Sequence, residues 1–216
     1  MKNENNIILE NIHKAIFDYD KKLIDEAVRE SIEKDLDPLE VFNEMMKSIR
    51  KIGDLYNEDK LFLPDLIAAS DTMQHVMPLL ERQMEIKGAK REVAGVVVIG
   101  TVYGDIHSIG KNIVCTLLRS EGFNVIDLGV NVSANNFAEA IRKYNSDLLA
   151  MSALLTTTMN EQKKVISFLE KENIRNKVKV IVGGAPVTEM FAKEIGADGY
   201  APTAPGAVKI SKNLIS

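Results

Sequence analysis

The stretch VAGVVVIGTVYGDIHSIGKNIVCTLLRSEG, residues 93–122, decides the fold class of this chain. Its first part, residues 93–102, is a short run rich in Val and Ile, which predicts a buried strand rather than a helix. A loop that contains Gly104 follows, and a helix is predicted over 109–121 with Gly122 at its end. A strand, a loop and a helix in this order begin a βαβ unit, so the stretch predicts an α/β domain.

The same alternation continues to the end of the chain. The further predicted elements are a strand at 123–130, a helix at 133–144, a strand at 147–155, a helix at 158–172, a strand at 178–182, and short elements around Phe191, Tyr200 and Val208. Strands that alternate with helices predict a five-stranded, mostly parallel sheet covered on both faces, in a Rossmann-like (flavodoxin-like) arrangement. Such sheets bind ligands at the carboxyl ends of their strands, so we expect a site in the loop after the first strand.

Residues before Gly88 have a different pattern, with apolar residues at helical spacing and few β-branched runs. Four amphipathic helices are predicted there, the third over 38–56 with Asp37 as its cap and the fourth after Pro64, with a kink at Pro78. Four such helices form an N-terminal helical bundle. The polar segment 87–92 contains glycine and is typical of a linker, so the predicted domains are 1–88, a helical capping bundle, and 89–216.

Charge and hydropathy exclude several classes of protein. The formal net charge is −4, which offers no basic surface for nucleic acid. No apolar run approaches the roughly 20 residues that a membrane helix needs, and the N-terminal residues have no apolar signal core. The single cysteine, Cys115, cannot form an internal disulfide, which fits a reducing compartment. We therefore expect a cytoplasmic protein without a nucleic-acid or membrane partner.

The loop after the first predicted strand carries Asp105 and His107, two residues apart, so their side chains share one side of an extended loop. The carboxylate can accept a hydrogen bond from one imidazole nitrogen and leave the other free to bind a metal. Gly104 and Gly110 flank the pair and allow a planar ligand to approach the backbone. On these residues alone, a metal-ligating His107 stands beside the simpler interpretation of a surface histidine.

Other known motifs do not account for this loop. Its glycines fit neither G-x-G-x-x-G nor G-x-x-x-x-G-K-[ST], because Gly110-Lys111 is followed by Asn112. His13 and His75 lie on predicted helices without the spacing of zinc ligands.

Three short motifs in order resemble the signature of the methionine synthase type of cobalamin-binding domain. They are Asp105-x-His107-x-x-Gly110, Ser152-x-Leu154 and Gly183-Gly184. Nearly the whole chain resembles the corrinoid proteins of methyltransferase systems that demethylate methylamines, methanol, methoxylated aromatics or quaternary amines such as betaines. The helical half contributes Ile52-Gly53-x-x-Tyr56 and Phe62-Leu63-Pro64-Asp65-Leu66 to this resemblance.

The resemblance implies that His107 is the lower axial ligand of cobalt and that Asp105 holds His107 and helps to relay a proton. It also implies that Ser152 hydrogen-bonds the benzimidazole of the nucleotide tail, and that Gly110 and the Gly183-Gly184 pair leave room for the tail. The cofactor contacts implied in this way are Gly104, Asp105, Ile106, His107, Ser108, Ile109, Gly110, Ser152, Leu154, Thr156, Gly183, Gly184, Ala185 and Tyr200.

The function implied by the resemblance is that of a methyl carrier. A Co(I) corrinoid takes a methyl group from a substrate held by a substrate-specific methyltransferase, and the resulting methylcobalamin passes it to a second methyltransferase. The acceptor is tetrahydrofolate or a thiol such as coenzyme M, and a reductive activase is a further implied partner. We expect a carrier subunit rather than a complete enzyme. Two alternatives stay open: a cobalamin-dependent sensor, and a nucleotide-binding or response-regulator-like domain without cobalt.

Overall fold

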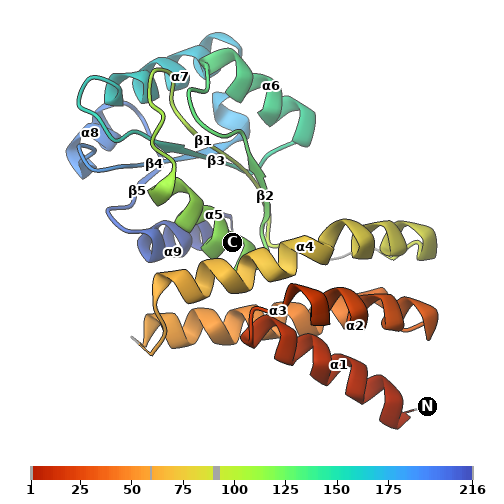
Figure 1. The fold of residues 1–216 in the computed structure, drawn as a ribbon. Coiled ribbons are helices and arrows are strands. Elements are labelled where there is room, and N and C mark those ends of the chain that lie inside the picture. Colours follow the sequence, from red (N-terminus) through yellow and green to blue (C-terminus); the bar gives the residue numbers. More distant parts are fainter. Residues whose placement is uncertain (1, 59, 90–92, 216) are drawn as a thin grey trace. The chain divides into compact units, whose positions relative to one another are not determined.

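The computed structural model describes residues 2–58, 60–89 and 93–215. The chain divides into two compact units, Met1–Glu92 and Val93–Ser216, which are described one at a time (Figure 1).

The first unit consists of four packed helices, as predicted. They are α1 (Lys2–Phe17), α2 (Lys21–Glu33), α3 (Pro38–Asn57) and α4 (Leu63–Lys87). The Asp37 side chain accepts a hydrogen bond from the Leu39 N–H at 2.9 Å, and Pro38 occupies the first turn, so the predicted cap of α3 is confirmed. Helix α4 continues through Pro78.

Helix α4 ends at Gly88, whose φ of +65° is the left-handed conformation that closes many helices. The predicted linker, 87–92, begins at this cap. Residues 90–92 lie outside the described residues, so the linker stays a prediction.

The second unit is an α/β domain around a five-stranded parallel sheet. Its elements are β1 (Val96–Thr101), α5 (Ile109–Ser120), β2 (Asn124–Asp127), α6 (Ala134–Tyr144), β3 (Leu148–Ser152), α7 (Met159–Lys171), a 3₁₀ turn (Arg175–Lys177), β4 (Lys179–Gly183), α8 (Glu189–Glu194), β5 (Gly199–Tyr200) and α9 (Ala204–Ile215). The strand order is β2-β1-β3-β4-β5, and every pair is parallel. This is the flavodoxin-like order, and the predicted fold class is confirmed.

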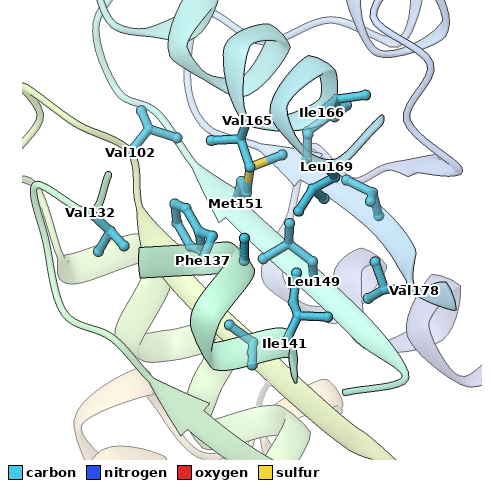
Figure 2. Packing of buried hydrophobic residues seen from close by; sticks show 14 of the residues in the cluster. Val102, Val132, Phe137, Ile141, Leu149, Met151, Val165, Ile166, Leu169 and Val178 are labelled. Atoms are coloured by element: carbon cyan, nitrogen blue, oxygen red, sulfur yellow. The ribbon is translucent and has the colours of Figure 1, made fainter. Parts of the chain in front are cut away.

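Helices α6 and α7 cover one face of the sheet, and α5 and α9 cover the other (Figure 1). Figure 2 shows the core under α6 and α7, where Leu149 and Met151 of β3 meet Val165 and Leu169 of α7. Successive side chains of a strand point to opposite faces, so Ser152 of β3 points toward the α5 and α9 side.

Three strands end in one row at the carboxyl edge. Thr101 of β1 pairs with Ser152 of β3, which pairs in turn with Gly183 of β4. The loops that follow these strands therefore emerge together, next to the point where the connections from β1 and β3 turn in opposite directions. This is the position at which a ligand site was predicted.

Strands β1, β2 and β3 are shorter than predicted, and just past the ends of β2 and β3 polar side chains accept backbone N–H groups. Strand β2 ends at Asp127, whose carboxylate accepts the Gly129 N–H at 2.8 Å. Strand β3 ends at Ser152, and the Leu154 N–H then donates to the carboxylate of Asp105 at 2.7 Å. Some ladder bonds persist just beyond these ends, from the Leu128 N–H to the Ile99 carbonyl and from the Ala153 N–H to the Gly183 carbonyl, but the strands extend no further although the apolar sequence continues.

Candidate functional site

Asp105 is the central buried group of the loop between β1 and α5, with a side chain that is 0% exposed. Its Oδ1 accepts the His107 N–H at 3.0 Å and lies 2.8 Å from Nδ1 of the His107 ring. Its Oδ2 accepts the Leu154 N–H and the Thr158 hydroxyl, both at 2.7 Å. Both carboxylate oxygens are thus paired, as a buried carboxylate requires.

Burial by itself raises the pKa of Asp105, but the hydrogen bonds from Thr158, from the His107 and Leu154 N–H groups and from the His107 ring outweigh it. The pKa of Asp105 therefore lies well below its usual range, and the group is a carboxylate at neutral pH. A carboxylate beside Nδ1 favours the tautomer that carries its proton there and its lone pair on Nε2. The His107 side chain is 46% exposed, so a metal can reach it.

The backbone of this loop is anchored from two neighbouring strands. The Thr101 hydroxyl, at the end of β1, donates to the His107 carbonyl at 2.8 Å. Asn131, in the loop after β2, donates its N–H to the Asp105 carbonyl at 2.9 Å and accepts the Gly104 N–H on Oδ1 at 2.8 Å. Asn131 has a φ of +56°, a conformation that asparagine tolerates better than most residues. The anchors limit the positions that the His107 ring can take.

Large apolar side chains are exposed around His107. They are Tyr103, Ile106 and Ile109 of the β1–α5 loop and helix start, and Leu154 and Leu155 after β3. An exposed apolar patch of this kind is typical of a surface that a ligand or another protein covers.

The signature glycines differ in why the chain needs them. A Cβ on Gly184, whose φ is +122°, would lie 1.8 Å from the Ala153 carbonyl oxygen, so the fold itself requires glycine there. A Cβ on Gly183 would lie 3.0 Å from the Ala201 carbonyl oxygen. A Cβ on Gly110 would meet nothing within 4 Å, so open space adjoins this residue.

Lys111 forms a buried ion pair with Asp127. Its Nζ lies 2.7 and 2.6 Å from the two carboxylate oxygens of Asp127, and the side chain is buried. A lysine held in this way is not available to cradle a phosphate, so the nucleotide-binding alternative gains no support from the Gly110-Lys111 pair.

The structure brings the predicted site residues to the carboxyl edge of the sheet. The stretch 104–110 leads from β1 into α5, Ser152, Leu154 and Thr156 follow one another at the end of β3, and Gly183, Gly184 and Ala185 follow at the end of β4. Tyr200 ends β5 and packs partly against the core cluster. Ser152 is half-buried, and its hydroxyl makes no hydrogen bond within the described part of the chain. Sequence reasoning missed Thr158, Asn131 and Thr101.

Replacing Thr158 by valine should lower the free energy of unfolding of the cofactor-free protein by about 1.5–3 kcal/mol, because a buried carboxylate loses a charge-assisted hydrogen bond. Serine at the same position keeps the hydroxyl and should restore most of this loss. Urea unfolding followed by circular dichroism measures both variants. Equal stabilities of the valine and serine variants would show that the Thr158 hydroxyl contributes nothing to holding Asp105.

Comparison with known proteins identifies the family. Residues 95–209 match the B12 binding domain family, and residues 8–81 match a second family of the same description. The dimethylamine corrinoid protein 2 of Methanosarcina acetivorans is 41% identical over 209 residues, which cover 96% of each chain. The chain belongs to the family of B12-binding corrinoid proteins. The resemblance noted from the three motifs is therefore confirmed.

Two further relatives extend the match. The trimethylamine corrinoid protein of Methanosarcina barkeri is 38% identical to this corrinoid protein over 209 residues, again 96% of each chain. In the crystal structure of the methanol:cobalamin methyltransferase complex of Methanosarcina barkeri, one chain is 33% identical with a TM-score of 0.87. The match covers 96% of this chain and 79% of that chain.

The site of this corrinoid protein fits a corrinoid in three respects. His107 offers a half-exposed nitrogen donor with a buried carboxylate behind it. Among the residues that the structure describes, no three His, Cys, Asp or Glu side chains are grouped so that they could hold a metal ion. A metal bound to His107 therefore needs ligands from another molecule, and a corrin ring supplies such ligands to its cobalt. The apolar side chains beside His107 suit the face of a large ring.

None of the described helices is long and apolar enough to span a membrane.

Proposed function

We propose that this corrinoid protein is a methyl carrier that works between two methyltransferases. It receives a methyl group from a methylated substrate on one partner and delivers the group to a second partner that uses tetrahydrofolate or coenzyme M as acceptor. The observation that carries the proposal is the Asp105–His107 pair, in which a buried carboxylate lies 2.8 Å from Nδ1 of a half-exposed ring and leaves Nε2 for a metal. When bound, the corrinoid supplies a cobalt that takes up and releases methyl groups.

The protein's own residues prepare the ligand. His107 would hold the cobalt through Nε2, and Asp105 would keep the proton on Nδ1, which makes the imidazole a stronger donor. Asp105 keeps its place because Thr158 and the Leu154 N–H occupy its second oxygen. A loop anchored at Thr101 and Asn131 then presents the ring in one orientation.

The nucleotide tail of the cofactor is proposed to enter at the carboxyl edge on the α5 and α9 side, toward which the Ser152 side chain points and where its ladder partner Gly183 has no side chain. The Ser152 hydroxyl is available for a hydrogen bond to the benzimidazole of the tail. The open space next to Gly110 leaves a passage at the start of α5. Ile106, Ile109 and Leu154 line the apolar surface that the ring covers.

The partners are proposed from the relatives. Two relatives are named for dimethylamine and trimethylamine, and a third belongs to a complex with a methanol:cobalamin methyltransferase. We infer a substrate-specific methyltransferase, a second methyltransferase for the acceptor, and a reductive activase as partners of this chain. None of these names points to a sensor, and the comparisons do not support the sensor alternative.

The test is transfer of a radiolabelled methyl group. The protein is loaded with cobalamin, reduced without oxygen, and mixed in the dark with labelled methanol, dimethylamine or trimethylamine and the corresponding Methanosarcina methyltransferase. One donor should label the protein fraction after gel filtration, and the label should leave when an acceptor methyltransferase is added. Failure of all donors, together with a light-dependent change of oligomeric state after loading with adenosylcobalamin, would replace the carrier by a sensor.

A further inference from the structure

The side-chain amide of Gln162 is completely buried and bridges β3 and β4 from the face of the sheet that α7 covers. It lies in the first turns of α7, and its Nε2 donates to the carbonyl oxygens of Met151 and Gly183, each at 3.1 Å. These carbonyls belong to β3 and β4 at their carboxyl ends. The side chain therefore ties together two strand ends that frame the site.

The orientation of this amide follows from its partners. Both neighbours are carbonyl oxygens, so the NH₂ group must face them, and the amide oxygen is turned away. Among the described residues, that oxygen, Oε1, has no hydrogen-bond partner although it is buried. A buried acceptor without a partner is unfavourable, and a methionine or leucine would fill the same place without one. The bridge therefore serves something other than packing.

The Gln162 bridge and the proposed slot for the nucleotide tail lie at the same strand ends, on opposite faces of the sheet. Met151 faces the core under α7, as Figure 2 shows, so its neighbour Ser152 faces the opposite side of the sheet. Ser152 pairs with Gly183, and these two residues form the last rung between β3 and β4. The Gly183 carbonyl that Gln162 holds also accepts the Ala153 N–H at 3.1 Å, at the point where the strands part.

We propose that Gln162 is a positioning residue that sets the separation of the β3 and β4 ends and thereby the shape of the slot for the nucleotide tail. This inference rests on the proposed function, since it needs a corrinoid with its tail in that slot. It assigns to Gln162 a role in the affinity for the tail and none in the affinity for the corrin ring.

Cobinamide, a corrinoid without the nucleotide tail, separates these two roles. Cofactor-free wild-type protein and the Gln162→Met variant are titrated with aquocobalamin and with cobinamide, and binding is followed by absorbance. The variant should bind cobalamin about tenfold more weakly, because the slot loses its bridge. Its affinity for cobinamide should change by less than about twofold.

Two controls accompany this comparison. Val165→Ala, a core change on the same helix that leaves the bridge intact, should keep the wild-type ratio of the two affinities. Ser152→Ala, on the slot side, should shift the ratio in the same direction as Gln162→Met. If Gln162→Met does not fold, Gln162→Leu also lacks the NH₂ donor, fills a similar volume without adding a polar group and provides the same comparison.

Each remaining outcome decides the question. Equal weakening of both corrinoids by the Gln162 variant, or no weakening of either, would overturn the role of Gln162. Wild-type protein that binds neither corrinoid would instead overturn the proposed function, so the two failures are distinguishable.

Discussion

Replacing His107 by alanine should leave the protein folded and abolish imidazole coordination of the bound corrinoid. The ring is half exposed, and the Asp105 oxygen that it contacts keeps the hydrogen bond from the backbone N–H of residue 107 at 3.0 Å, so little packing is lost. Cobalamin affinity should fall by ~100-fold or more, because loss of a side chain that only supports a metal ligand can already weaken metal binding by that factor. Reconstitution with hydroxocobalamin and an absorbance spectrum measure both effects.

The wild-type spectrum should be that of a corrinoid with its benzimidazole displaced and histidine bound, and the variant should lose this spectrum. His75→Ala is the matched control, because His75 is an exposed histidine on α4 in the other unit and is expected to have no effect. An unchanged spectrum and affinity for the His107 variant would remove His107 from the coordination of cobalt.

The fold was predictable because its elements carry local signals. Ser133 caps α6 through a hydrogen bond from the Asn136 N–H at 3.2 Å, and the β-branched runs of β1 and β4 fill the buried centre of the sheet. Strand ends were less predictable. Apolar Leu154 extends the pattern of β3, but its N–H is bonded to a carboxylate 49 residues earlier in the chain. The hydropathy pattern depends on the side chains alone, so it does not predict which group accepts a hydrogen bond from the backbone N–H of Leu154.

The same limit applies to the site. Asp105 and His107 were predictable as a pair because one loop carries both. Thr158 and Asn131 come from other loops, and only the alignment of β1 and β3 and the bridge between Val102 and Val132 bring them to that loop. The run Thr156-Thr157-Thr158 offers three equivalent hydroxyls in sequence, of which the structure places Thr158 on the Asp105 carboxylate while Thr156 is exposed.

Replacing Gly184 by alanine should destabilise the cofactor-free protein by about 3 kcal/mol or more. Two effects add. A φ of +122° is strained for any residue with a side chain, and the new Cβ would lie 1.8 Å from a backbone oxygen, that of Ala153, which cannot rotate away. Chemical unfolding followed by far-ultraviolet circular dichroism measures the loss. Gly196→Ala isolates the first effect, since Gly196 has a φ of +76° with no atom within 4 Å of a Cβ, and it should cost only about 1–2 kcal/mol.

Gly110→Ala is the matched comparison, because Gly110 belongs to the same three-part signature as Gly184 but lies in helix α5 with open space around its Cβ position. Alanine there should leave the cofactor-free protein as stable as before, or stabilise it by about 0.5–1 kcal/mol, since alanine favours helix more than glycine does. The Gly110→Ala variant should instead bind cobalamin more weakly than the wild-type protein does. Equal losses for the Gly110 and Gly184 variants without cofactor would contradict this division between a glycine that the chain needs and a glycine that the cofactor needs.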